Sequence, residues 1–213
     1  MILLRMNLLP KHGADFASKD YWKSFFDKQK DPFEWYGNYF DLAHILTKYV
    51  KAQDEILMVG CGNSELSEEL YSKQDCKLIT NIDISENVIE RMKKKSAENG
   101  ISMIYEVGDV TNMKYTDESF NAVIGNFCLK LAIFKLSRSP LFLNNYFLDK
   151  GTLDAMMVDE KADTIEMIDK MFLEIERCIK NNGRYIVITL AQPHIANHIT
   201  KHFAGRPGWI VRF

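Results

Sequence analysis

A glycine-rich turn between a short apolar run and a helical pattern constrains the fold of this chain most. The turn is Val59-Gly-Cys-Gly-Asn63, preceded by the apolar run 55–59 and followed by the helical pattern 64–73. A second apolar run covers 78–82, and Asp83 stands directly after it. Strand, glycine turn, helix, strand and terminal acid are typical of the first half of a nucleotide-binding α/β unit. Glycine lets the backbone approach a ligand closely, and the terminal carboxylate can accept both hydroxyls of a ribose.

The same turn argues against a dinucleotide as the ligand. A dinucleotide fingerprint has a third glycine where this chain has Glu65, and Glu68 and Glu69 follow within one helical turn. A pyrophosphate prefers a helix N-terminus without negative charge nearby. An adenosyl ligand with a cationic centre and no phosphate fits better, and S-adenosylmethionine is such a ligand. A nicotinamide dinucleotide and an ordinary turn without a ligand are the alternatives.

Composition narrows the possible partners and the compartment. The 213 residues suffice for one domain with a sizeable core. A net charge of −2 gives no basic face for nucleic acid or an anionic membrane, and no apolar run has the roughly 20 residues of a membrane span. No cysteine pair has the C-x-x-C spacing, which indicates a reducing compartment, the cytosol. We therefore expect a cytoplasmic protein; composition does not define its oligomeric state.

Hydrophobic periodicity predicts alternating strands and helices along most of the chain. The expected strands cover 55–59, 78–82, 103–107, 120–124 and 184–190. The expected helices cover 20–26, 40–49, 64–73, a stretch capped by Ser85, and 164–179, which Asn181-Asn182-Gly183 should end. This alternation indicates a mostly parallel sheet with helices on both faces. We expect an N-terminal extension at 1–19 and one domain at 20–213.

Several longer motifs allow a family resemblance to be stated. They are Met6–Lys11, Phe33–Gly37, Gly60–Ser67, Asn81–Ser85, Asp149–Ala155, Gly183–Tyr185 and Thr189–Gln192. On these segments the chain resembles the N-terminal domain of the methyltransferase-like protein 13 family, dual methyltransferases of translation elongation factor 1-alpha. The resemblance implies a Rossmann-like α/β fold with a seven-strand methyltransferase sheet and S-adenosyl-L-methionine as cofactor. It also implies protein-lysine methylation, with elongation factor 1-alpha as the protein substrate.

The expected cofactor-binding residues cluster at the ends of the first three strands and in the Phe33–Gly37 motif. They are Trp35, Tyr36, Gly60, Cys61, Gly62, Asn63, Asp83, Ile84, Asp109 and Val110. We assign Asp83 to the ribose, Asp109 to the adenine amino group, and the two glycines to the methionine moiety. Asp83 could instead cap the following helix, and Asp109 could serve only its turn. Trp35 and Tyr36 would roof the donor or line a lysine channel, although such aromatics are often simply core.

Asp149 is the expected catalytic residue. Methyl transfer to an amine is an in-line displacement, so the enzyme mainly aligns the reactants. The lysine must lose its proton from a reference pKa of about 10.4, which desolvation lowers, and a carboxylate can position its nitrogen. Asp149 could instead cap the turn before Thr152. We expect no metal site: His194, His198 and His202 recur on one helix face, which we interpret as a solvated surface.

Two segments depart from the family pattern. Residues 125–148 interrupt the fourth strand, and we interpret them as a retained intron or an equivalent gene-model artefact, with a genuine loop as the alternative. Such an apolar insertion should protrude from the sheet. The run 208–213 should begin a strand whose hairpin partner, the last strand, is missing. Two other functions therefore stay open: a truncated, catalytically inactive isoform acting as a binding module, and a small-molecule methyltransferase.

Overall fold

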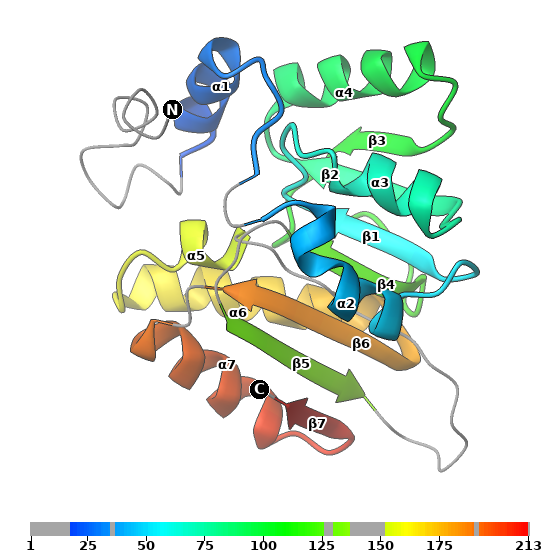
Figure 1. Ribbon diagram of the computed structural model, residues 1–213. Coiled ribbons are helices and arrows are strands. Elements are labelled where there is room, and N and C mark those ends of the chain that lie inside the picture. The colour runs from blue at the N-terminus through cyan, green and yellow to red at the C-terminus, as the bar shows by residue number, and fades with distance from the viewer. Residues whose placement is uncertain (1–17, 35–36, 126–129, 137–151, 190–191, 213) are drawn as a thin grey trace.

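The described residues form a seven-stranded sheet with helices on both of its faces. A computed structural model describes residues 18–34, 37–125, 130–136, 152–189 and 192–212. The strands, in chain order, are β1 Glu55–Val59, β2 Leu78–Asp83, β3 Ile104–Val107, β4 Phe120–Gly125, β5 Lys130–Leu136, β6 Ile179–Thr189 and β7 Trp209–Arg212. The helices are α1 Lys19–Lys28, α2 Tyr39–Tyr49, α3 Leu66–Lys73, α4 Glu86–Glu98, α5 Thr152–Met156, α6 Ala162–Cys178 and α7 Pro193–Ala204. In Figure 1, α2 and α3 lie in front of the sheet and α6 lies behind it.

Five parallel strands form the half of the sheet that carries the glycine turn. The sheet order is β3-β2-β1-β4-β6-β5-β7, and all pairs from β3 to β6 are parallel. Residues 56–59 are buried, as expected for a central strand covered on both faces. The chain moves outward from β1 to β2 and β3, and then crosses back to β4. Parallel α/β sheets bind ligands at the carboxyl ends of the strands beside such a reversal, which is where the glycine turn follows β1.

The two N-terminal helices form as predicted, and each has a recognisable start. The Ser18 side chain accepts a hydrogen bond from the Tyr21 amide at 3.3 Å, which caps α1. Asn38 and Asp41 form a reciprocal capping box at the start of α2. The helices pack through buried aromatic and aliphatic residues, among them Phe26 and Leu46. Among the described residues, no helix combines the length and apolarity that crossing a bilayer requires.

The predicted end of the long amphipathic helix, Ile179, is correct within one residue, but the predicted stop signal at 181–183 is wrong. Helix α6 ends at Cys178, and β6 begins at Ile179, so residues 181–183 belong to the strand. The register with β4 shifts there, from Phe120 opposite Ile179 to Ala122 opposite Arg184. Asn182 has a φ of 67°, a left-handed value that asparagine tolerates better than most residues. The asparagine and glycine signal therefore marks an irregularity inside a strand rather than a helix C-cap.

The inserted segment supplies an internal strand, which contradicts the expected protrusion. Residues 130–136 form β5, antiparallel to β6 on one side and to β7 on the other. The strand expected at 208–213 is confirmed as β7, and the antiparallel position beside it is filled by a segment from earlier in the chain. The sequence Lys-Leu-Ala-Ile-Phe-Lys-Leu contains no glycine or proline and suits a strand. Pairing on both sides also satisfies its backbone groups. The remaining residues of the insertion, 126–129 and 137–148, lie outside the described part.

Candidate donor-binding site

The glycine turn adopts a backbone that requires glycine at two positions. Gly60 and Gly62 have φ values of 59° and 50°, in the left-handed region. The Cys61 amide between them donates to the Ile82 carbonyl at 3.0 Å, so the turn folds over the end of β2. Each glycine is also closely approached. A Cβ on Gly60 would lie 2.2 Å from Thr152 Oγ1, and one on Gly62 would lie 3.0 Å from a ring carbon of Phe26.

Asp83 joins the tip of β2 to this turn. Its Oδ2 accepts a hydrogen bond from the Gly62 amide at 2.9 Å, and its Oδ1 accepts one from the Ser85 amide at 2.9 Å. Only 7% of the residue is exposed. Burial raises the pKa of Asp83 to about 6, although the backbone donors oppose that rise. Because Ser85 precedes α4, Asp83 does support a helix start. The backbone amides of Gly62, Ile84 and Ser85 act on a carboxylate with about four lone-pair sites, so acceptor capacity remains for a ribose hydroxyl.

Asp109 lies at the neighbouring strand end, in an exposed turn. Its Oδ1 accepts hydrogen bonds from the amide and the hydroxyl of Thr111, at 2.8 and 2.7 Å. The preceding Gly108 amide donates to the Asp83 carbonyl at 3.0 Å, which keeps β2 and β3 together past the last paired residues. The next residue, Val110, is buried. The structure thus brings Asp83 and Asp109 to the same edge of the sheet, and it also gives Asp109 the turn role that was the alternative.

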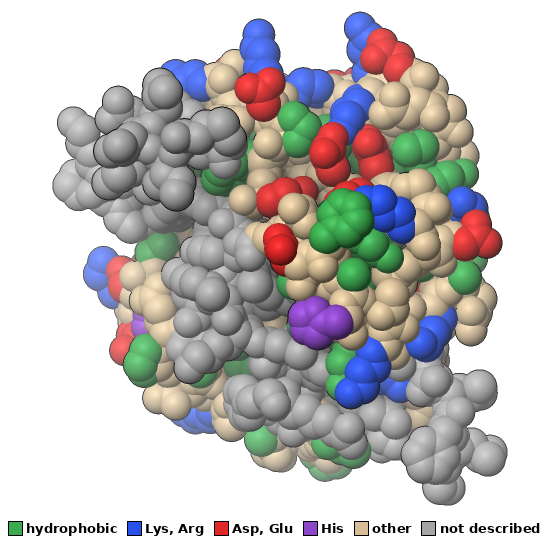
Figure 2. Space-filling view, in the orientation of Figure 1, with side chains coloured by type: hydrophobic (Ala, Val, Ile, Leu, Met, Phe, Trp, Pro, Cys, Tyr) green, Lys and Arg blue, Asp and Glu red, His purple; other side chains and the backbone are tan. Residues whose placement is uncertain are grey.

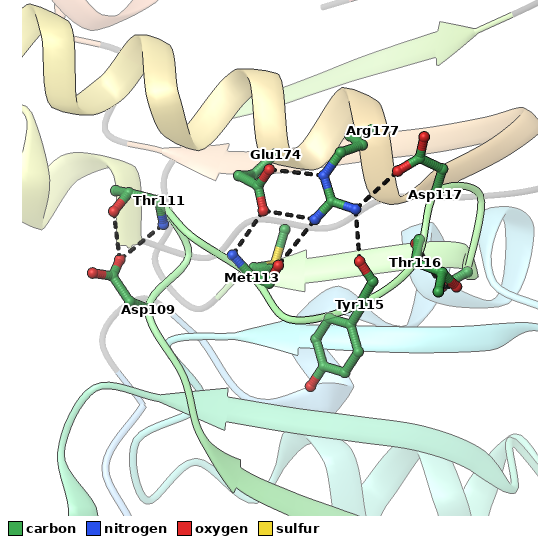
Figure 3. A network of polar contacts seen from close by, with 9 residues as sticks. Asp109, Thr111, Met113, Tyr115, Thr116, Asp117, Glu174 and Arg177 are labelled. Carbon is green, nitrogen blue, oxygen red and sulfur yellow. Dashed lines mark hydrogen bonds and ion pairs between the residues drawn. The ribbon is translucent and has the colours of Figure 1, made fainter.

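An ion-pair network fastens the connection between β3 and β4, which carries Asp109, to α6 (Figure 3). Arg177, at the end of α6, donates to the Tyr115 and Met113 carbonyls at 2.6 and 3.0 Å. It also pairs with Glu174 at 2.8 Å and with Asp117 at 3.0 Å. The Arg177 hydrogen bonds hold the pKa of Glu174 below its usual value. The connection between β3 and β4 is therefore fastened to α6 rather than left to its own turns.

The other expected cofactor residues in the described part are buried or contact other groups of the protein. Cys61 is buried, and that burial raises the pKa of its thiol well above the usual value, so it packs as a neutral group. The Asn63 amide nitrogen donates to the carbonyls of Gln29 and Asp31, at 3.1 and 2.6 Å. Ile84 is half-buried beside Asp83. The Asn63 side chain thus faces the segment after α1, while its position in the turn is the one predicted.

Sequence reasoning missed three polar residues around this turn. The Glu34 carboxylate accepts hydrogen bonds from the Ser64 hydroxyl and the Glu65 amide. Lys95 of α4 pairs with both Glu65 and Glu68, at 2.8 and 3.1 Å. Arg91, one turn earlier, donates to the carbonyls of Phe26 and Gln29. Glu34 belongs to the Phe33–Gly37 motif, which was a usable signal, whereas the two α4 residues follow only from the packing of α1 on α4.

Acidic side chains gather on the surface where α3 begins (Figure 2). Glu34 is half-buried there, and Glu69 lies one turn further on and pairs with Lys73. The structure therefore agrees with the prediction that this helix N-terminus is poorly suited to a pyrophosphate. Lys95 offsets part of this negative charge. Its ammonium group forms ion pairs with Glu65 and Glu68 and is therefore not directed at a ligand phosphate.

Three predicted site residues, Trp35, Tyr36 and Asp149, lie outside the described part. The nearest described residue after Asp149 is Thr152, which starts α5. Its hydroxyl donates to the Val59 carbonyl at 3.1 Å, directly before the glycine turn. The chain after the insertion therefore returns to the edge of the sheet that carries the glycine turn.

Two of the three histidines on α7, His198 and His202, are largely covered and do not form the solvated face that we expected. His198 stacks on Phe172 of α6 with ring centroids 5.8 Å apart, and its Nε2 lies 2.9 Å from an oxygen of Asp169. Only 7% of the His202 side chain is exposed. The imidazoles of His198 and His202 pack on the Phe172 ring and also reach acids, which is why these two side chains turn inward. In the described ranges, no cluster of three His, Cys, Asp or Glu side chains could hold a metal ion.

Comparison with known proteins identifies the family to which this chain belongs. A family described as a methyltransferase domain matches residues 51–206, which include the glycine turn, Asp83 and Asp109. The chain belongs to this family, and S-adenosylmethionine is the cofactor of such a domain. Two crystal structures, the YcgJ protein from Bacillus subtilis and the cyclase SpnF, share the fold at 13% and 14% identity. Their TM-scores are 0.50 and 0.52, and the alignments cover 77% and 76% of this chain and 57% of each of theirs.

Curated relatives are more similar in sequence. The chain is 43% identical to a Bos taurus protein named "eEF1A lysine and N-terminal methyltransferase" and 42% identical to the Homo sapiens protein of that name. Each alignment covers 97% of this chain and 26% of the relative, so the chain spans about a quarter of their length. The Bos taurus "EEF1A lysine methyltransferase 4" is 27% identical over 96% of this chain and 72% of its own.

Proposed function

We propose that this chain is an S-adenosylmethionine-dependent protein-lysine methyltransferase domain whose substrate is translation elongation factor 1-alpha. The substrate assignment rests on one observation: 43% identity along 97% of the chain to a relative named for that activity. The 27% identical protein, which is also named as a lysine methyltransferase of this factor, supports lysine as the acceptor. A cytosolic location fits the same proposal, because Cys61, Cys76 and Cys178 are buried as thiols rather than joined in disulfides.

The donor-site residues fit an adenosyl ligand without phosphate. Gly60 and Gly62 have left-handed φ values and no room for a Cβ, because Thr152 and Phe26 approach them closely, so only glycine allows this turn beside the end of β2. With a pKa of about 6, Asp83 is mostly ionised at pH 7 and can accept ribose hydroxyls. Asp109 lies at the next strand end, in reach of the opposite part of an extended nucleoside. When bound, S-adenosylmethionine supplies an electrophilic methyl group, and the protein has to present an amine to it.

The acceptor side of the mechanism rests on Asp149, Trp35 and Tyr36. The aromatic residues would exclude water from the lysine, which lowers the pKa of its ammonium group. Asp149 would accept a hydrogen bond from the amine nitrogen and hold its lone pair toward the methyl group. The Thr152 hydroxyl bond to Val59 supports this arrangement, because it ties the helix after Asp149 to the start of the donor turn.

The test is methylation of recombinant elongation factor 1-alpha by the purified chain with labelled S-adenosylmethionine, followed by mass spectrometry of its lysines. We expect one modified lysine and no label on the factor when the chain is omitted. Asp83→Ala should weaken donor binding by about 1.5–3 kcal/mol, the value of hydrogen bonds to a charged group. Asp149→Asn should lower turnover far more than donor affinity. Donor binding without methyl-lysine on this factor, together with modification of another substrate, would refute the substrate assignment.

A further inference from the structure

Glu34 caps the first turn of α3 from thirty residues away in the sequence. Its Oε1 accepts a hydrogen bond from the Glu65 amide at 2.8 Å. Both carboxylate oxygens accept from the Ser64 hydroxyl, at 2.8 and 2.9 Å, and the Ser64 oxygen in turn accepts from the Leu66 amide at 3.1 Å. The amides that open a helix have no partner within it. Here Glu34 and Ser64 provide partners for two of these amides, those of Glu65 and Leu66, although Glu65 itself gives α3 no side-chain cap.

These contacts decide what the helix N-terminus can still bind. Exposed N-terminal amides and the helix dipole attract phosphate groups. In this chain a carboxylate of its own already occupies that position, so a ligand phosphate would meet both a filled site and a like charge. An uncharged or cationic group beside the turn meets neither obstacle. This agrees with an adenosyl donor and adds Glu34 to the three acids, Glu65, Glu68 and Glu69, that the sequence indicated.

The same contacts fasten the segment after α1 onto the glycine turn. Asn63 donates to the Gln29 and Asp31 carbonyls, and Phe26 lies against Gly62. Glu34 is the last described residue of this segment, and the motif continues directly into Trp35 and Tyr36.

We propose that Glu34 is a positioning residue of the donor site, which couples donor binding to the attachment of residues 29–34 on the glycine turn. The inference rests on the proposed function, since it takes S-adenosylmethionine to be the ligand of that turn. Glu34 acts through Ser64 and the Glu65 amide and need not touch the donor. Donor affinity then depends on an interaction between two segments of the protein, and the same interaction protects the first amides of α3.

The test compares S-adenosylmethionine binding to the full chain and its variants by calorimetry. Glu34→Ala should raise the dissociation constant about tenfold, and Glu34→Gln, which keeps one acceptor oxygen, should raise it about threefold. Ser64→Ala should also weaken binding, and the loss in the double variant should be smaller than the product of the two single losses, because both single variants break the same Glu34–Ser64 hydrogen bond. Glu98→Gln is the control for charge, since Glu98 makes only an exposed pair with Lys94 at 3.8 Å.

Two further measurements separate positioning from general stability. Hydrogen exchange in peptides that contain the Glu65 amide should be faster in Glu34→Ala and unchanged in Glu98→Gln. At saturating donor, kcat should stay within about twofold of the parent while the donor KM rises. Glu34→Ala and Glu34→Gln affinities within twofold of the parent, or losses in the double variant that multiply, would overturn the proposal. Failure of the parent itself to bind S-adenosylmethionine would instead refute the proposed function.

Discussion

The two halves of the sheet are built in different ways. From β3 to β6 every strand is parallel, and the strand ends carry the glycine turn, Asp83 and Asp109. Beyond β6 the sheet continues through β5 and β7, where β5 comes from the segment that interrupts the family pattern and pairs with strands that follow it in the chain. The first half depends on a contiguous succession of strands and helices. The second half depends on β5, whose partner strands are remote in sequence. The position of β5 in the sheet is therefore not evident from the neighbouring sequence.

The largest expected effect comes from breaking β5. Ile133 is paired with Ile186 on one side and with Arg212 on the other. Ile133→Pro removes a backbone donor and fixes φ in an internal strand, so we expect a loss of about 3 kcal/mol. This corresponds to a fall of roughly 10 °C in melting temperature for a chain of this size. Lys130→Pro, at the first residue of the strand, is the matched control and should cost much less.

Deleting residues 125–148 tests the same strand more severely and should also lower the melting temperature. The exposed-loop interpretation of the insertion predicts a rise instead, so calorimetry of the deletion variant distinguishes the two interpretations. Donor binding at low temperature should survive in Ile133→Pro, because the donor turn belongs to the other half of the sheet. If Ile133→Pro lowers the free energy of donor binding by as much as it lowers the free energy of unfolding, the two halves of the sheet are not independent.

A medium effect is expected from adding one methyl group to the donor turn. Gly60→Ala places a Cβ within 2.2 Å of Thr152 Oγ1, whereas a Cβ on Gly100 would meet nothing within 4 Å. Both glycines have left-handed φ values, 59° and 67°, so each substitution carries about 1–2 kcal/mol of backbone strain. Only Gly60→Ala should also reduce S-adenosylmethionine affinity, by more than about tenfold. Equal affinities in the two variants would show that the close approach at Gly60 has no bearing on the donor.

The smallest effect is a pH dependence that belongs to the donor half alone. Burial raises the pKa of Asp83 from 3.8 to about 6. The folded chain therefore holds this proton to higher pH than the unfolded chain does. The stability that Asp83 contributes is fully present below about pH 4 and is lost as the pH rises through 6. Donor affinity should change in the opposite direction, because the ionised carboxylate is the better acceptor, with about a tenfold gain from pH 5 to pH 7.

Calorimetric titrations of S-adenosylmethionine at several pH values measure this dependence. Asp83→Asn should bind more weakly than the parent at pH 7 and should show a flat profile between pH 5 and pH 7. A profile in Asp83→Asn as steep as that of the parent would assign the titration to another group.

The donor half could be predicted closely because its signals are local. The predicted strands 55–59 and 120–124 agree with β1 and β4 within one residue, and Gly60, Gly62 and Asp83 meet as the motif indicates. Contacts that join separate segments were out of reach. Nothing in the sequence next to Glu34 indicates Ser64 as its partner, and nothing next to Lys95 indicates two acids on α3.

The segment that forms β5 shows that a strand and an exposed inserted loop can have similar sequences. A short apolar run between turn signals is compatible with an exposed loop, a buried helix or a strand until its partners are known. The run 130–136 finds β6 and β7, and the pairing decides its state. The prediction that Asn181 and Asn182 end a helix was wrong for a related reason. A residue with left-handed backbone angles occurs both at helix ends and at irregularities inside strands.

The pairing of β5 also has a consequence for synthesis on the ribosome. Lys130 meets Thr189, and Leu136 meets Trp209, so the strand leaves the exit tunnel well before either neighbour has been made. At about 5–20 residues per second, its partners arrive several seconds later. During that interval an apolar strand without its neighbours is a substrate for chaperones and a starting point for aggregation. Soluble yield should therefore respond to translation rate and to chaperone supply more strongly than the stability of the finished fold would indicate.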